Sequence, residues 1–379
     1  MDSLRGSAAF VGTGLAGIGQ CPGFTHLDLM GLAVHNALED AGIRLSEVDG
    51  LFTANMNNIL PTLVVGEYLG IQPAVAVGTN TGGNSFIDHV LWAALALRAG
   101  LCNVALICYG SNQRTGKSAP PDLPPYETPY NPREPISSYA MAAQRHMYQY
   151  GTTRRQLASV AVAARRWAQR NPIAVARDPL TVEDVLASRL ICDPLSLLDC
   201  CLVTDGAGAV LMTRAERAAH QKHEPVYLLG CASAQTHRQI SQMPDLTVTA
   251  AAQSGPRAFS MAGLSPADVD VLQLYDAFTI NVLLFLEDLG FCAKGEAGPF
   301  VEAGAIAPGG SLPVNTNGGG LSCVHPGMYG IFALIEAIEQ LRGRGGERQV
   351  AGANVALAHG NGGMLSAQTT AILGTRAVL

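Results

Sequence analysis

A short phrase occurs twice in the sequence, and this repeat constrains the fold more than any other feature. Ala41-Gly42 followed by Glu47-Val48-Asp49 recurs 221 positions later as Ala262-Gly263 followed by Asp268-Val269-Asp270, in a chain of 379 residues. In both copies an amphipathic segment ends at a Gly turn and leads into an apolar stretch with a polar, Gly-rich tip. This pattern predicts a helix, a turn, a strand and a functional loop. Two copies, rather than a long array, predict a duplicated α/β domain whose halves frame one shared site.

Composition excludes several classes of protein. The chain is 48% hydrophobic and 14% charged and contains 42 glycines, which predicts a large globular core with many tight turns. A net charge of −6 leaves no basic stripe, so we expect no nucleic-acid partner. No apolar run reaches about 18 residues and no signal pattern opens the chain, so we expect a cytoplasmic protein without membrane contact. The nine scattered cysteines lack paired CxxC spacing, which predicts buried thiols and no metal site.

The order of hydrophobic periods predicts two halves, residues 1–220 and residues 225–379, each with mixed β-sheet covered by helices. Residues 214–224 are charged and form the expected linker. Residues 111–195 are predicted to leave the first half as an excursion. It opens with the Pro-rich loop 117–135, expected to be a lid, and continues with helices at about 136–150 and 154–170. A second long Gly/Pro loop is expected at 294–320.

Six motifs along the chain occur in the order found in one enzyme family. They are Asp205-Gly206-Ala207, Tyr275-Asp276-Ala277-Phe278-Thr279, Asn315-Thr316-Asn317-Gly318-Gly319, His325-Pro326-Gly327, Gln340-Leu341-Arg342-Gly343 and His359-Gly360-Asn361-Gly362-Gly363. With these motifs the chain resembles the thiolase superfamily over essentially its whole length. It looks most like the branch related to sterol carrier protein X and bacterial lipid-transfer proteins, including steroid side-chain aldolase-like members that lack the nucleophilic cysteine.

The resemblance carries expectations about architecture and partners. It implies the thiolase fold, a duplicated α-β-α-β-α five-layered sandwich with a loop excursion. It also implies a homodimer, an acyl-coenzyme A thioester as substrate and no separate cofactor. Members of the lipid-transfer branch that lack the cysteine commonly work with a small subunit that carries an OB-fold and a zinc ribbon, so we expect such a partner.

The sequence departs from thiolases where their chemistry begins. Thiolases place a nucleophilic cysteine at the start of the helix that corresponds to Ser85–Arg98, where the helix N-terminus favours the thiolate. Counting back from Ala99-Gly100, the matching position is Gly83, which has no sulfur. Ser85 would need an adjacent base to attack, so we expect it to cap the helix and contact the substrate rather than to act as a nucleophile.

Four residues are predicted to be catalytic. His325 keeps its place in the motif that helps thiolases to bind the thioester oxygen, and a donor there would stabilise an enolate. His359 stands at the position of the second thiolase cysteine and could transfer protons, or could simply bond to backbone in a turn. Tyr275 and Tyr329 are phenols near the predicted site, suited to proton transfer or to packing. The residues expected to bind substrate are Ser85, Asn317, Gly319 and Gly362.

The combination favours carbon–carbon chemistry without an acyl-enzyme. Our leading hypothesis is (retro-)aldol cleavage of a β-hydroxyacyl-coenzyme A, with a steroid side chain as one candidate acyl group. Tyr275 or Tyr329 would remove the β-hydroxyl proton, and His325 would hold the enolate. A second hypothesis is an acyltransferase or thiolase with a displaced nucleophile at Cys323. A third is a non-catalytic thiolase-like subunit of a complex that processes acyl-coenzyme A.

Overall fold

The computed structural model describes residues 4–116, 125–218 and 222–379. Its main feature in these residues is a nine-stranded sheet with the order β3-β2-β4-β7-β1-β8-β11-β10-β9. Part of the predicted lid, residues 117–124, and part of the predicted linker, residues 219–221, lie outside the described residues. Within the described part of the chain, no helix combines the length and the apolar character needed to cross a membrane.

Both halves contain strands and helices, as predicted. The first half contains β1 (Ala8–Gly19), α1 (His26–Ala41), β2 (Gly50–Thr53), α2 (Pro61–Leu69), β3 (Val75–Val77), α3 (Ser85–Arg98), β4 (Val104–Ser111) and β7 (Asp205–Arg214). Between β4 and β7 the excursion contains α4 (Ile136–Tyr150), α5 (Arg154–Ala168), α6 (Val182–Ala187), β5 (Leu190–Cys192) and β6 (Leu195–Ser196). The rest of the chain forms α7 (Ala215–Ala218), β8 (Val226–Gln235), α8 (Ala251–Ala262), β9 (Val271–Leu274), α9 (Thr279–Asp288), α10 (Ala297–Glu302), α11 (Gly330–Leu341), β10 (Val355–Gly362) and β11 (Ala367–Gly374).

The two halves repeat one strand topology, which confirms the duplication. In the first half β2 pairs parallel with β4, β4 antiparallel with β7, and β7 antiparallel with β1. In the second half β9, β10, β11 and β8 pair in the same way. The half-sheets meet where β1 pairs with β8 at two positions. The limits 1–220 and 225–379 stay a prediction.

The repeated phrase has the same structural role in both copies. α1 ends at Gly42 and α8 at Gly263, and both glycines adopt a left-handed conformation that closes the helix. The carboxylate of Asp49 accepts the backbone N–H groups of Asn103 and Val104 before β4. Asp270 accepts those of residues 354 and 355 before β10. The repeated aspartates therefore fix where the neighbouring parallel strand starts.

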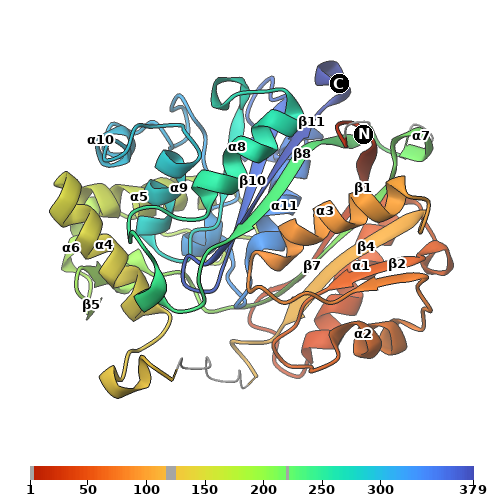
Figure 1. Cartoon of the computed structure of the whole chain (residues 1–379), viewed down its shortest axis with the longest axis horizontal. Helices are drawn as coiled ribbons and strands as arrows, with labels where there is room; N and C mark the ends of the chain where they lie inside the picture. The colour runs from red at the N-terminus through yellow and green to blue at the C-terminus, as the bar shows by residue number, and fades with distance from the viewer. Residues whose placement is uncertain (1–3, 117–124, 219–221) are drawn as a thin grey trace.

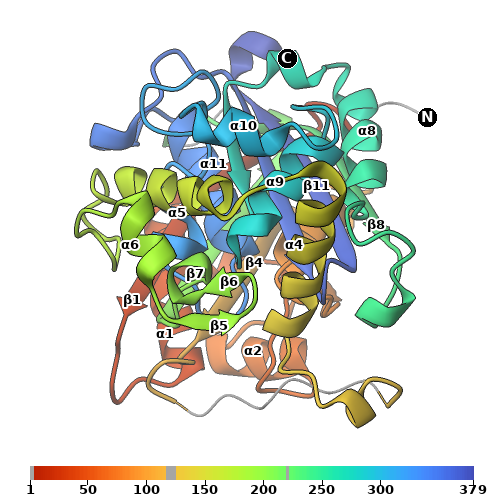
Figure 2. The ribbon, with the colours of Figure 1, turned by 90° about the vertical axis from the view of Figure 1, so that its left-hand side faces the viewer.

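The helices complete the expected five layers. α1 and α2 cover the outer face of the first half-sheet, and α8 covers the outer face of the second. α3 and α11 contact each other and both half-sheets, so they form the central layer. Figure 1 shows the elements of the first half gathered on one side of the molecule, with the excursion helices α4, α5 and α6 on the other. In Figure 2 these helices and β5 and β6 face the viewer beside α9 and α10.

The predicted long loop at 294–320 needs a correction, because it contains two helical turns. α10 lies inside it, and residues Gly319–Cys323 form a π-helical turn. α10 packs on α5 of the excursion and on α9. Glycine and proline spacing indicates a loop, but burial of Ala297 and Val301 against neighbouring helices stabilises helix here.

A network of charges joins the end of α1 to the segment that follows α11. Asp40, near the end of α1, accepts hydrogen bonds from Arg342 (2.8 Å) and Arg344 (2.6 Å), which follow α11. Burial alone would raise the pKa of Asp40. Hydrogen bonds from Arg344 and from the backbone of Thr13, together with the charge of Arg342, outweigh burial and lower that pKa to about 2. This network ties a helix of the first half to the site-bearing helix of the second.

We predict that Asp40→Asn lowers the free energy of unfolding by about 2–4 kcal/mol, because it leaves buried arginine charge without its counter-ion. The depressed pKa means that this stabilisation is complete above pH 3.8 and is lost as the pH falls toward 2. Urea unfolding measures the difference. The control is Glu39→Gln, one residue away in an exposed pair with His35, for which we expect less than about 1 kcal/mol. Equal effects of the two changes would contradict the prediction.

Candidate active site

Glycines allow three segments of backbone to meet at the start of α3. A Cβ atom on Gly362 would lie 1.7 Å from the carbonyl oxygen of Thr81, and one on Gly330 would lie 2.1 Å from that of Gly83. No residue with a side chain fits at such distances. The loop before α3, the start of α11 and the end of β10 are therefore packed backbone against backbone. The expected substrate-binding position Gly362 lies in this contact.

Tyr275 occupies the space in which a side chain at position 83 would stand. A Cβ atom on Gly83 would lie 2.2 Å from Cε2 and 2.5 Å from the hydroxyl oxygen of Tyr275. The sequence resemblance predicted that Gly83 corresponds to the nucleophilic cysteine of thiolases. In this chain the ring of Tyr275 fills the space that a side chain at position 83 would need.

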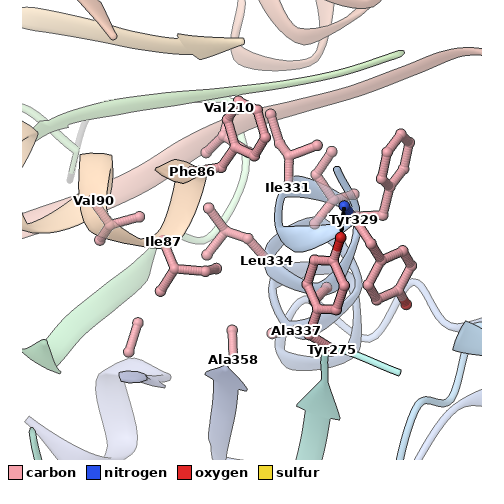
Figure 3. Close-up of a cluster of buried hydrophobic side chains, with 14 of the residues drawn as sticks. Phe86, Ile87, Val90, Val210, Tyr275, Tyr329, Ile331, Leu334, Ala337 and Ala358 are labelled. Carbon is pink, nitrogen blue, oxygen red and sulfur yellow. Dashed lines mark hydrogen bonds between the residues drawn. The ribbon is translucent and has the colours of Figure 1, made fainter. Parts of the chain in front are cut away.

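Tyr275, Tyr329 and His325 form a cluster of three rings, as the sequence predicted. The Tyr275 ring stands edge-on to the other two, with centroids 5.6 Å from His325 and 5.7 Å from Tyr329. The hydroxyl of Tyr275 accepts the backbone N–H of Tyr329 (3.2 Å) just before α11, and donates to the carbonyl of Gly327 (3.3 Å). Figure 3 shows the two tyrosines beside the apolar side chains that α3 and α11 share.

Asn317 and Gly319 lie next to this cluster and bond to it and to each other. The hydroxyl of Tyr329 donates to Oδ1 of Asn317 (3.0 Å), which also accepts the backbone N–H of Gly319 (2.7 Å). Asp276 accepts the N–H of Gly320 (2.6 Å), as expected for a structural carboxylate. Burial raises the pKa of Asp276 to about 7. Substrate binding by Asn317 and Gly319 stays a prediction, since Oδ1 of Asn317 and the N–H of Gly319 already have partners here.

His325 has a ring nitrogen without a hydrogen-bond partner. Its Nε2 is buried and has no hydrogen-bond partner among the described residues. Its ring is stacked parallel to that of Tyr329, with an interplanar angle of 9°. Burial lowers the pKa of His325 to about 4, so the imidazole is neutral near pH 7. A buried, unpaired nitrogen beside two phenols has the geometry expected for a group that a ligand will satisfy.

The structure places His359 differently from the prediction. Gly360 and Gly362 of β10 face the start of α3, so the alternation of the strand turns His359 to the other face. There its ring bonds to Thr370 (3.0 Å) and Gln368 (2.8 Å), and burial lowers its pKa to about 3. This is the placement of a structural histidine in the sheet. The acid/base role of His359 stays a prediction, and both of its ring nitrogens have partners in the sheet.

Ser85 and Cys323 are both committed to local contacts. The hydroxyl of Ser85 donates to the carbonyl of Gly82 (2.7 Å) and accepts the N–H of Thr81 (2.9 Å), both in the loop before α3. The N-cap residue of α3 is Asn84, so Ser85 braces this loop rather than capping the helix as expected, and its contact with substrate stays a prediction. Cys323 is 1% exposed, and its sulfur contacts the amide of Asn171 at 3.6 Å. Burial raises the pKa of Cys323, which disfavours the thiolate that a displaced nucleophile would need.

Sequence reasoning missed two polar residues beside the cluster. Tyr139 of α4 lies close enough to Tyr275 to affect its ionisation, and Asn281 of α9 lies beside Tyr139. Tyr139 occupies a buried helix position that is typical of a core aromatic, and Asn281 lies in the apolar run of a buried helix. Their only signal was a polar amide inside an apolar run. In the described residues, no cluster of His, Cys, Asp or Glu could hold a metal ion.

Comparisons with known proteins settle the family. A family model described as a thiolase C-terminal domain-like region matches residues 232–375. An acetyl-CoA acetyltransferase of Methanothermobacter thermautotrophicus is 34% identical to the chain, over 94% of this chain and 96% of its own length. The chain belongs to the thiolase superfamily.

Further relatives place it near members of the superfamily that cleave carbon–carbon bonds. A protein of Mycobacterium tuberculosis named 17-hydroxy-3-oxo-4-pregnene-20-carboxyl-CoA lyase is 35% identical over 90% of this chain and 92% of its own length. The solved structure named Ltp2-ChsH2(DUF35) aldolase superposes with a TM-score of 0.91 at 32% identity, over 99% of both chains. This thiolase-superfamily chain therefore resembles both an acetyltransferase and aldolases, and the site has to distinguish them.

The contact between Gly83 and Tyr275 gives a first prediction for this site. Gly83→Ala should lower the free energy of unfolding by about 1–3 kcal/mol, because the new methyl group overlaps the phenol. In the Tyr275→Ala background most of this cost should disappear, giving a coupling energy above about 1 kcal/mol. Chemical denaturation of the four proteins measures the cycle. Additive effects would show that another contact limits position 83.

Buried neutral histidines give a second prediction. The pKa of His325 in the folded protein is about 4, below its ordinary value of 6.5. Between these two values the unfolded chain binds a proton at His325 that the folded chain does not bind. The contribution of the neutral His325 to the free energy of unfolding is therefore complete above pH 6.5 and is lost as the pH falls toward 4. His325→Gln should reduce proton uptake on unfolding near pH 5 by about one, measured from the pH dependence of unfolding. An unchanged dependence would mean that His325 titrates normally.

Proposed function

We propose that this protein cleaves the Cα–Cβ bond of a β-hydroxyacyl-coenzyme A by a retro-aldol reaction, without a covalent acyl-enzyme. The observation that carries the proposal is the overlap between position 83 and Tyr275. A thiolase mechanism requires a thiolate where this chain has a glycine covered by a phenol. The site instead gathers two phenols and a neutral imidazole, which are groups that move and hold protons.

The surroundings of the two phenols support different roles for them. Burial raises the pKa of both well above 10, so both are neutral in the empty site. The oxygen of Tyr275 accepts an N–H at the start of α11, where the helix end favours negative charge. Tyr329 instead lies near the carboxylates of Asp276 and Glu336, which oppose its ionisation. Tyr275 is therefore the phenol that can ionise and act as the base, whereas Tyr329 keeps its proton until the strongly basic enolate takes it.

The reaction then follows in balanced steps. Tyr275 first releases its own proton to solvent, and the resulting phenolate takes the proton of the β-hydroxyl group. The Cα–Cβ bond breaks, the β-carbon becomes a carbonyl, and the bonding electrons pass into the thioester enolate. His325, with the proton on Nε2, donates a hydrogen bond to the enolate oxygen. Tyr329 gives its proton to the enolate, which becomes the shortened acyl-coenzyme A, and then takes up a proton from solvent equal to the one that Tyr275 released.

The relatives support this reaction and suggest where to look for the substrate. The names of the Mycobacterium tuberculosis lyase and of the solved aldolase both describe carbon–carbon cleavage. The lyase is named for a steroid acyl-coenzyme A, so we propose a β-hydroxyacyl-coenzyme A with a steroid-like acyl group as the first candidate. Coenzyme A enters as part of the substrate, and no further cofactor takes part in the proposed steps.

Two other functions have weaker support. A thiolase or acyltransferase would need Cys323 as a thiolate, and that sulfur is buried and its pKa is raised. The acetyltransferase relative favours this alternative through its name alone. A silent binding subunit would not need an unpaired histidine nitrogen between two phenols, and leaving such a group buried costs about 1–3 kcal/mol.

A partner subunit is part of the proposal. The solved aldolase is named as a pair of components, Ltp2 and ChsH2. We propose that this chain forms a homodimer that also binds a small subunit with an OB-fold and a zinc ribbon, as the lipid-transfer resemblance implies. The activity test should therefore be run on the chain alone and together with such a subunit.

The deciding experiment incubates the protein with a β-hydroxyacyl-coenzyme A and follows both the protein and the products by mass spectrometry. We expect a ketone or aldehyde and a shortened acyl-coenzyme A, with no acyl adduct on the protein. Tyr329→Phe should reduce turnover by roughly 10²–10⁴-fold, and Cys323→Ala by less than about threefold. An acyl adduct that disappears in Cys323→Ala would establish the thiolase alternative instead.

A further inference from the structure

Asn281 is the most anomalous polar residue in the described part of the chain. It is fully buried in the first turn of α9, and neither Nδ2 nor Oδ1 has a hydrogen-bond partner. Among the described residues, the other buried side chains without partners lack one at a single atom, whereas Asn281 lacks one at both its donor and its acceptor. Leaving a buried amide unsatisfied costs about 1–3 kcal/mol for each group. Such a cost needs an explanation.

The amide lies at the edge of the proposed site. Asn281 follows Phe278 by three residues, and Phe278 packs against Tyr139 with ring centroids 4.5 Å apart. The amide is close enough to the Tyr139 hydroxyl to favour its ionised form, although the two groups do not form a hydrogen bond. Tyr139 in turn lies beside Tyr275. Asn281 therefore extends the polar wall that begins at the proposed base.

A directed chain of hydrogen bonds explains why Tyr139 does not satisfy this amide. Gln368 donates to Asn361 (2.7 Å), and Asn361 donates to the hydroxyl of Tyr139 (2.7 Å). The Tyr139 hydroxyl then donates to the carbonyl of Gly363 (3.1 Å). His359 starts the same chain at Gln368. The phenol is thus engaged as both acceptor and donor by the sheet, which leaves the neighbouring amide free.

A second contact holds together the two helices that carry Tyr139 and Asn281. Farther along the same helix pair, Nε2 of His146 on α4 bonds to Glu287 on α9 at 3.0 Å, and both side chains are buried. Lys294 also pairs with Glu287, at 3.3 Å. α4 and α9 are therefore fixed at the Tyr139 end and at the Glu287 end. The position of Asn281 follows from this packing.

We propose that Asn281 is a specificity residue that binds the hydroxyl group of the acyl substrate. Its Nδ2 donates to the hydroxyl oxygen, and its Oδ1 accepts the hydroxyl proton in the resting complex. This inference rests on the proposed retro-aldol function, in which the same proton then passes to Tyr275. The carbonyl product has no proton to offer, so Oδ1 loses its partner after cleavage and the product binds less well than the substrate.

The test compares two ligands that differ by one hydroxyl group. Binding of 3-hydroxy-3-methylbutyryl-coenzyme A and of 3-methylbutyryl-coenzyme A is measured by calorimetry for the wild-type protein and for Asn281→Leu. The wild type should prefer the hydroxylated ligand by roughly tenfold or more, since the unpaired amide is satisfied by it alone. Asn281→Leu should bind both ligands about equally, with affinity for 3-methylbutyryl-coenzyme A retained. A wild type without preference, or a preference unchanged by Asn281→Leu, would overturn the inference.

Stability provides an independent readout with a matched control. Asn281→Leu replaces an unsatisfied amide by an apolar side chain of similar shape, so its thermal midpoint should be unchanged or higher. Gln349→Leu makes the same chemical change at an amide whose atoms bond to Gly345, Gln340 and Val350. That variant should melt lower and keep the ligand preference. If Asn281→Leu melts lower as well, the amide has an internal partner such as water, and the inference fails.

The same measurements separate this inference from the proposed function. Product analysis by mass spectrometry tests cleavage and makes no use of the binding ratio. A preference that depends on Asn281 in a protein that cleaves nothing would uphold the hydroxyl-binding residue and remove the aldolase. Cleavage together with a ligand preference that is the same in wild type and Asn281→Leu would uphold the aldolase function and remove the hydroxyl-binding role of Asn281.

Discussion

The site depends on backbone that touches backbone. Glycines at positions 330 and 362 let the loop before α3, the start of α11 and the end of β10 approach to distances that a Cβ atom forbids, and Gly83 leaves room for the ring of Tyr275. Two helix N-termini and one strand end therefore converge on a small volume. The phenol of Tyr275 fills that volume and is fixed by the backbone N–H of Tyr329. Without these glycines the rings that define the site could not meet.

Much of the fold was predictable because its pattern occurs twice in the sequence. The repeated Gly ends both helices, and Asp49 and Asp270 then hold the backbone of the adjacent parallel strand in each half. Such local patterns indicate elements and their order. They did not reveal α10, since its stability comes from packing on α5 and α9 rather than from its own Gly- and Pro-containing sequence.

The site was predicted in part, for reasons that individual residues make plain. Tyr275, Tyr329 and His325 lie in motifs at loop or helix starts, and the structure brings their rings together. His359 lies in a motif as well, but strand alternation turns it into the sheet, where Gln368 and Thr370 satisfy it. The direction of a side chain depends on pairing register, which motif order does not specify. Asn281 depends on how α9 packs against α4, which no local pattern records.

The overlap between position 83 and Tyr275 also constrains the history of the chain. A cysteine restored at position 83 would collide with the phenol while Tyr275 remains. Loss of the phenol first would open a cavity in the core, and removing a large buried aromatic typically costs about 3–5 kcal/mol. A chain that acquires a nucleophilic cysteine at position 83 would thus pass through a destabilised single variant, whichever of the two positions changed first. Lineages that acquire this pair are expected to diversify by changing the acyl pocket and to keep the chemistry.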